Sequence, residues 1–192
     1  MSKVYLVNVG ANSAHASMAR SPISDDGSFV FVSFPHAGIR GVRPYPVKAR
    51  PFVRGVDIYH THNDPDWPNL TYGDGCHSPR ARALRRVEEN DILLFWGLLW
   101  QKNGKGWDAF TGERSWYLFG ALRVREILEE GQRPTDASAS RIKRARQNVH
   151  FYRGELDEGN RVFIGCTRYS RLFRVGVDLE VRDHRRTVSM EV

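Results

Sequence analysis

The chain has 192 residues, of which 41% are hydrophobic and 27% charged, a composition typical of one globular domain. Its longest apolar runs are too short for a signal peptide or for the roughly 20 residues of a membrane span, so we expect a cytoplasmic protein without membrane contact. Cys76 and Cys166 are too few for a disulfide framework or a metal site built from cysteine alone. The net charge of +7 is compatible with anionic partners such as nucleotides or nucleic acid.

The first part of the chain is predicted to hold strands joined by loops. Apolar alternation predicts a strand at residues 3–9, and β-branched and aromatic residues predict another at 28–34, with a loop at 12–24 between them. Residues 36–55 are rich in proline and glycine, as expected of a long surface excursion or of a lid over a site. A short strand at 56–59 would follow.

The second part of the chain is predicted to mix helices and strands. Ser78-Pro79 would start a helix at 80–89, followed by a buried strand at 92–100, a turn at 102–106 and a partner strand at 116–127. The remaining predicted elements are a basic helical segment at 135–150, a strand at 161–165, and a helical turn or strand at 170–177. These elements predict a single α+β domain over 1–192: a bent, mixed or mostly antiparallel sheet or partly closed barrel, flanked by two or three helices.

The polar segment at residues 59–77 is the main functional signal in the sequence. It holds three histidines, three aspartates and a cysteine without apolar periodicity, which is more chemistry than a loop requires. The candidate catalytic residues are His62, Asp64, Asp66 and Asp74, with His62 or Asp64 as general base. Cys76 is a poor nucleophile candidate, because the side chains of Cys76 and His77 would point apart on extended backbone.

A divalent metal is one hypothesis for this segment. His60 and His62 would share one face of a strand and, with Asp64, would offer a mixed nitrogen and oxygen ligand set for zinc or another first-row ion. Asp66, Asp74 or His77 could complete the set. The alternative is that Asn63-Asp64-Pro65 forms a turn in which Asp64 caps the backbone.

Metal-free recognition or catalysis at a nucleotide is the second hypothesis. A base needs polar groups at its edge and an aromatic ring on its face, and a phosphate needs a cation or free backbone N–H groups. The predicted substrate-binding residues are Arg20, Asn12, Trp67, Tyr72, Trp100 and Trp107. The alternatives are an ion pair of Arg20 with a nearby aspartate and burial of tryptophan rings in the core.

The basic helical segment offers contacts for a nucleic-acid backbone. Positive charge is concentrated on it at Arg141, Lys143, Arg144 and Arg146.

Two resemblances to known families add to this interpretation. Residues 90–96 and 117–124 resemble the paired apolar strands of pseudouridine-synthase-and-archaeosine-transglycosylase-like barrels, which read modified bases, although Asn90 stands where glycine is usual. A wider resemblance covers nearly the whole chain and includes residues 4–10, 20–22, 26–29, 61–66, 71–74, 91–95 and 165–172. Through these residues the chain resembles the third type of nucleotide modification associated domain. This resemblance implies a small α+β protein in a DNA-modification or phage-defence setting and implies no particular mechanism.

Three functions are therefore open. The favoured one is recognition, with or without processing, of a modified base, nucleotide or nucleic acid. The alternatives are a metal-dependent hydrolase or lyase acting on a nucleotide, and a non-catalytic accessory protein of a defence complex. A nucleotide or nucleic acid is the expected partner, and a divalent metal is the one cofactor considered.

Overall fold

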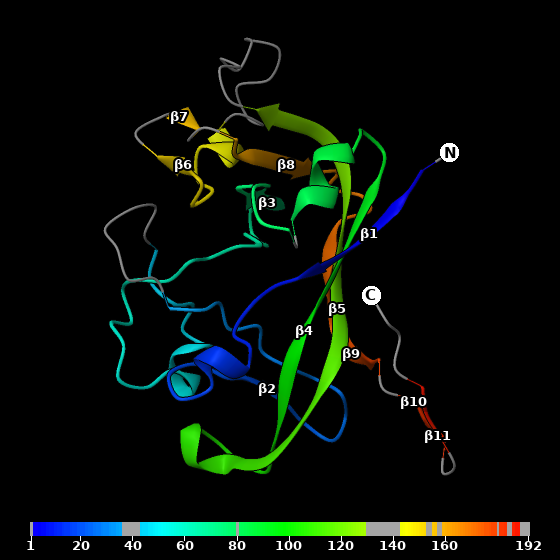
Figure 1. Cartoon of the computed structure of the whole chain (residues 1–192). Helices are drawn as coiled ribbons and strands as arrows, with labels where there is room; N and C mark the ends of the chain where they lie inside the picture. Colours follow the sequence, from blue (N-terminus) through cyan, green and yellow to red (C-terminus); the bar gives the residue numbers. More distant parts are fainter. Residues whose placement is uncertain are drawn as a thin grey trace.

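Two long antiparallel strands form the centre of the fold (Figure 1). A computed structural model describes residues 2–35, 43–79, 81–129, 143–152, 155–156, 159–179, 181–183 and 186–188. Strand β4 spans Ile92–Lys102 and strand β5 spans Phe110–Glu129, and they pair from Ile92 opposite Arg123 to Lys102 opposite Phe110. Nearly every second residue of β4 is buried, as expected of a central strand.

Each long strand carries two shorter strands, one after the other, on its outer edge. On β4 these are the parallel strands β1 (Val4–Asn8) and β2 (Ser21–Ile23). On β5 they are the antiparallel strands β8 (Arg161–Gly165) and β9 (Arg171–Asp178). Strand β3 (Thr71–Asp74) pairs with the far edge of β8 and completes a seven-stranded mixed sheet.

Two further strand pairs lie outside this sheet. Strands β6 (Phe151–Tyr152) and β7 (Glu155–Leu156) form one of them, and β10 (Val181–Asp183) and β11 (Arg186–Val188) form the other.

Register irregularities and glycines shape the sheet. The pairing of β4 with β5 shifts in register between Phe95 and Trp96 and between Trp100 and Lys102, and β5 has one further shift against each of β8 and β9. A Cβ at Gly120 would overlap the indole of Trp67, so the missing side chain lets the polar segment pack against β5.

Buried apolar residues form three clusters; one consists of Leu128, Ala145, Val162 and Ile164, and the other two are larger. The largest one joins buried residues of the main strands, including Leu93, Phe95, Leu122 and Phe163. The remaining one gathers Ala11, Ala19, Val32, Tyr45, Ala49 and Phe52. The described part of the predicted excursion at 36–55 thus contributes Tyr45, Ala49 and Phe52 to a buried cluster.

The predicted α+β class with two or three flanking helices is wrong, because strands dominate the described chain. The helical elements described are short 3₁₀ turns, η1 (Ser13–His15), η2 (Arg50–Phe52), η3 (Arg82–Arg86) and η4 (Trp107–Ala109), and one α-helical turn at 143–145. At the predicted helix 80–89, Ala81, Leu84 and Val87 are all buried. A spacing of three residues matches the 3.0 residues per turn of a 3₁₀ helix, so this geometry places all three side chains in the core. Residues 135–142 of the predicted basic helix lie outside the described residues.

The strand predictions are mixed. Those at 3–9, 92–100, 116–127 and 161–165 are confirmed by β1, β4, β5 and β8, and 170–177 is a strand, β9. The strand predicted at 28–34 is wrong, since only isolated bridges occur at Ser28 and Phe29, and 56–59 is not a strand. Within the described residues, no helix has the length and apolar character needed to cross a membrane.

Candidate functional site

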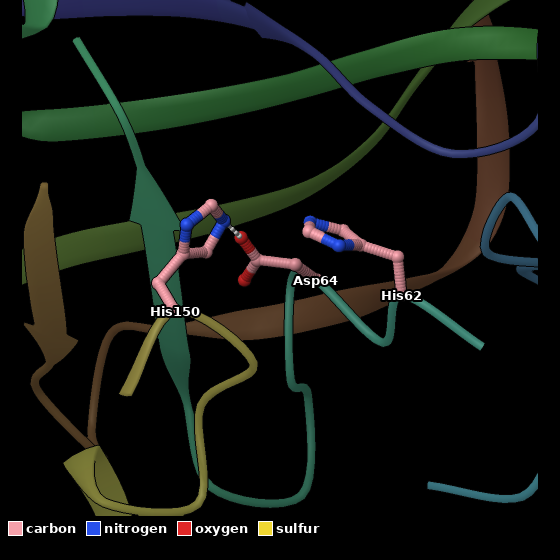
Figure 2. A group of neighbouring side chains, drawn as sticks. All are labelled: His62, Asp64 and His150. Carbon is pink, nitrogen blue, oxygen red and sulfur yellow. Dashed lines mark ion pairs between the residues drawn. The ribbon is translucent and has the colours of Figure 1, made fainter. Parts of the chain in front are cut away.

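Three side chains with metal-binding and proton-transfer chemistry converge beside β3. They are His62, Asp64 and His150, whose potential ligand atoms all lie within 4.8 Å of one another. Figure 2 shows the Asp64 carboxylate between the two imidazoles, with Nε2 of His150 3.3 Å from its Oδ2 atom. Asp64 is buried, whereas both histidines are partly exposed. A molecule arriving from solvent can therefore reach the imidazoles before the carboxylate.

Asp64 is held by the protein on several sides. The backbone N–H of Gly73 in β3 donates to both carboxylate oxygens, at 2.9 and 3.1 Å. Nδ2 of Asn148 donates to Oδ1 at 3.0 Å. Burial raises the pKa of Asp64, and the contact with His150 together with the hydrogen bonds from Gly73 and Asn148 opposes this effect. The carboxylate is thus fixed in orientation but remains poorly solvated.

The His62 ring is positioned by a stack of aromatic rings. It lies on Phe34 with centroids 4.5 Å apart and planes 19° apart, and Phe34 in turn stacks on His15 at 5.2 Å. The His150 ring meets His62 edge-on at 5.1 Å. The backbone N–H of His62 also donates to the carbonyl of Phe34, and that of Asp64 donates to the carbonyl of His62. These contacts place the side chains of residues 62 and 64 in one cluster although this segment is not a strand.

His150 reaches the cluster through hydrogen bonds of Asn148. Besides its bond to Asp64, the Asn148 side chain donates to the hydroxyl of Thr71 and accepts from the backbone N–H of His150. A Cβ at Gly73 would overlap the His150 ring and would lie 2.6 Å from Oδ1 of Asn148. Gly73 therefore allows residues 148–150 to pack directly on β3.

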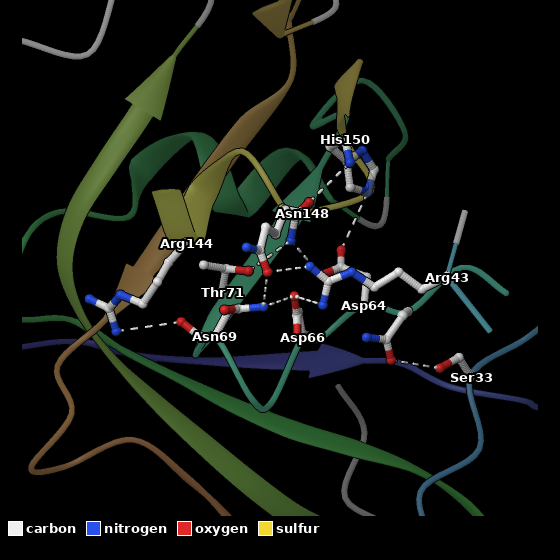
Figure 3. A network of polar contacts seen from close by, with 11 residues as sticks. Ser33, Arg43, Asp64, Asp66, Asn69, Thr71, Arg144, Asn148 and His150 are labelled. Atoms are coloured by element: carbon white, nitrogen blue, oxygen red, sulfur yellow. Dashed lines mark hydrogen bonds and ion pairs between the residues drawn. The ribbon is translucent and has the colours of Figure 1, made fainter. Parts of the chain in front are cut away.

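A second polar group anchors the same segment (Figure 3). The guanidinium of Arg43 contacts Oδ2 of buried Asp66 at 3.1 Å and donates to Gln147 at 2.5 Å. Asn69 donates to both Asp66 and Gln147, and Arg144 donates to the Asn69 carbonyl at 3.4 Å. Burial raises the pKa of Asp66, opposed by Asn69 and Arg43. Asp66, predicted as a catalytic residue, is placed in this anchoring group.

Of the remaining residues predicted in 59–77, most make structural contacts. Asp74 accepts from the Tyr72 hydroxyl at 2.7 Å and from the backbone N–H of Cys76. The Tyr72 ring is buried against Phe95, and burial raises its pKa well above the ordinary value. Trp67 also packs on Phe95. His60 is exposed and pairs with Asp57 at 2.7 Å, so the structure groups His62 and Asp64 with His150 instead of His60.

The predicted phosphate-binding Arg20 lies elsewhere in the fold. Its guanidinium sits 4.7 Å from the ring centroids of both Trp100 and Trp107, and its Nε donates to the Ala16 carbonyl. Trp100 pairs with Pro22 of β2, whereas Asp64 accepts from Gly73 of β3, and β2 and β3 lie toward opposite ends of β4 (Figure 1). Arg20 and these two rings therefore form a cation–π group apart from the cluster.

Asn12 is connected to the cluster indirectly. Its side chain caps η1 by accepting from Ala14, and its backbone N–H donates to Nδ1 of His15 at 3.3 Å. It therefore fixes the outer ring of the stack that positions His62.

The four residues predicted to contact a nucleic-acid backbone differ in their surroundings. Lys143 and Arg146 are exposed, Arg144 takes part in anchoring the segment, and Arg141 lies outside the described residues. Two exposed cations thus lie on the short segment that leads to His150.

His150, Asn148, Arg43 and Phe34 belong to this site and were missed by the sequence analysis. No local spacing connects them to the polar segment, since Asn148 and Asp64 are 84 positions apart. The one available signal was an unassigned histidine, His150, at the end of the basic segment.

An open, strand-rich fold with a buried carboxylate between two imidazoles defines a protein with a candidate catalytic or metal-binding centre. Residues 3–190 match the model of one protein family, nucleotide modification associated domain 3, and the chain belongs to that family. Neither the curated proteins nor the solved structures include a significant match to the chain. The similarity to base-reading barrels stays a prediction.

Proposed function

We propose that this protein recognises and chemically processes a modified base, nucleotide or nucleic acid at the His62–Asp64–His150 cluster. The observation that supports this most directly is the buried Asp64 carboxylate held against two partly exposed imidazoles. Membership of a nucleotide modification associated family supports the class of substrate. The DNA-modification or phage-defence setting implied by the resemblance would supply such a substrate.

Proton transfer is the chemistry that suits this arrangement. A carboxylate beside an imidazole orients the ring and stabilises its protonated form, which lets the ring take a proton from a substrate or from water. Asp64 is placed to act in this way on His150. His62, fixed by Phe34, is the second candidate for a group that accepts or donates a proton.

Processing is favoured over recognition alone because of how the aromatic rings are used. A reader of bases needs open rings on which a base can stack. Tyr72 and Trp100 are buried, and Trp67 packs against Phe31, Phe95 and Gly120. A buried carboxylate with a raised pKa is, in contrast, the kind of group that marks a catalytic site.

The exposed cations of the segment before His150 suit an anionic substrate. Lys143 and Arg146 would contact phosphates and contribute affinity that falls as salt concentration rises. A substrate held there would lie on the element that carries His150.

The test is a turnover assay on a panel of nucleosides, nucleotides and DNA with modified bases. Wild-type protein is expected to convert one member of the panel, while His62→Ala loses turnover and keeps affinity within a few-fold, and Asp64→Asn also loses turnover. His60→Ala is the matched control, because His60 is an exposed histidine two residues away that pairs with Asp57. Binding without turnover by the wild type would refute processing, and neither binding nor turnover would favour the accessory-protein alternative.

A further inference from the structure

We infer that His62, Asp64 and His150 bind one first-row divalent transition-metal ion. The use of this ion in catalysis rests on the proposed function. The binding of the ion rests on the geometry of the three side chains alone.

The donor set defines the class of ion. Two imidazole nitrogens and one carboxylate oxygen are the ligands of catalytic zinc and of non-haem iron sites, which keep further positions open for water or substrate. Mg²⁺ and Ca²⁺ prefer sites dominated by oxygen. The set therefore favours Zn²⁺, Fe²⁺, Co²⁺ or Mn²⁺ over Mg²⁺.

The distances between the donor atoms suit chelation. Two ligands each about 2.0–2.2 Å from a tetrahedral ion lie roughly 3.3–3.5 Å apart. The separation of His150 Nε2 and Asp64 Oδ2 is 3.3 Å. The His62 ligand atom lies within 4.8 Å of both, so its partly exposed ring has to shift toward them for all three donors to reach one ion.

The surroundings of Asp64 resemble the outer shell of a metal site. Metal-binding carboxylates are held by hydrogen bonds that fix their orientation. Oδ1 accepts from Asn148 and Gly73, whereas Oδ2 accepts from Gly73 and faces His150. Oδ1 thus accepts from two protein donors, whereas Oδ2 accepts from one and keeps a lone pair for an ion.

Charge balance also favours a cation at this position. The guanidinium of Arg43, in the neighbouring polar group, pairs with Asp66. Asp64 itself pairs with His150, an imidazole that carries a charge only when protonated. A divalent ion would compensate the buried carboxylate and the cost of removing it from water.

The test is equilibrium dialysis of chelator-treated full-length protein against Zn²⁺ or Co²⁺, with Mg²⁺ as the comparison ion. We expect one Zn²⁺ or Co²⁺ per chain and weak Mg²⁺ binding. His62→Ala, Asp64→Asn and His150→Ala should each weaken the affinity about 100-fold or more. Asn148→Ala should weaken it about 10–100-fold, since Asn148 orients a ligand. His60→Ala should leave it unchanged.

Two further measurements distinguish loss of a metal ligand from loss of the fold. The visible absorption of Co²⁺ in the wild type should differ from that of the free ion and should change in His62→Ala, whose side chain is partly exposed. Thermal melts of the metal-free variants identify any that fail to fold. Absence of stoichiometric binding, equal Mg²⁺ affinity, or undiminished binding in folded His62→Ala and His150→Ala would overturn the inference.

The metal and the activity can fail separately. Stoichiometric Zn²⁺ binding without turnover on any substrate would leave the metal site standing and refute the proposed processing. His62-dependent turnover by a protein that fails to bind Zn²⁺ or Co²⁺ stoichiometrically would refute the metal site and leave the processing in place.

Discussion

Gly73 lies where the functional cluster meets the sheet, and its replacement by alanine tests the described geometry. A Cβ at this position would overlap the His150 ring and lie 2.6 Å from Oδ1 of Asn148, both of which must then move away from β3. Overpacking of this kind costs about 1–3 kcal/mol. Loss of the hydrogen bond from Asn148 to the Asp64 carboxylate costs a further ~1.5–3 kcal/mol. Because moving Asn148 relieves part of the overlap, we expect a net destabilisation of about 2–4 kcal/mol.

The measurement is the free energy of unfolding from urea denaturation, with Gly75→Ala as the matched control. A Cβ at Gly75 would lie 3.1 Å from the end of the Asn160 side chain, which can shift, so its cost should stay below about 1 kcal/mol. Gly73→Ala should also cost less in a His150→Ala background, with a coupling of at least about 1 kcal/mol. Equal effects of the two alanine variants, or no coupling to His150, would refute this account of the site.

Three other predictions concern different parts of the chain. Burial, with the charge of Asp74, raises the pKa of Cys76 to about 11. At pH 8 a maleimide should therefore label Cys166 and leave Cys76 unlabelled, and labelling of Cys76 should increase as the pH approaches its pKa. Rapid labelling of Cys76 in native protein would contradict its burial. Burial raises the pKa of Asp91, but hydrogen bonds from the backbone of Lys3 and Glu88 outweigh this effect and lower the pKa overall. The resulting stability is present above the pKa of Asp91 in the unfolded state and is lost as pH falls through its pKa in the folded state. Asp91→Asn should therefore flatten the acid side of a plot of unfolding free energy against pH, and an unchanged slope would contradict this prediction. Arg20→Ala should lower the melting temperature through loss of its cation–π contacts while leaving Zn²⁺ affinity unchanged, and a large loss of affinity would show that Arg20 acts at the cluster.

The central part of the sheet could be predicted because its residues carry a strong local signal. β4 and β5 are apolar runs separated by a turn, and this pattern indicates two buried, antiparallel strands. Strands β2 and β3 gave no such signal. β2 contains Pro22, a residue that is tolerated in edge strands and is unfavourable elsewhere in a sheet. β3 contains Gly73, which leaves space for residues 148–150 but weakens the strand pattern in the sequence.

The candidate site was predicted in part for a similar reason. His62 and Asp64 are close in sequence and stand out as chemistry that a turn does not need. His150 joins them only because Asn148 binds Asp64 and Thr71 across the fold. Such a contact depends on tertiary packing, so no spacing in the sequence could indicate it. Arg20 shows the reverse case, since a cation in a polar loop proved to be held between aromatic rings.

The segment that carries His150 depends on the site for its own position. Its described residues hold one α-helical turn, at 143–145, and short isolated helices are unstable in water. Its attachment includes bonds of Asn148 to Asp64 and of Gln147 to Arg43 and Asn69, together with the burial of Ala145 and Val149. A change at Asp64 therefore removes a functional group and also loosens the element that supplies His150. The effects of Asp64 and Asn148 variants should for this reason be non-additive, and the contribution of each residue has to be measured by a double-mutant cycle.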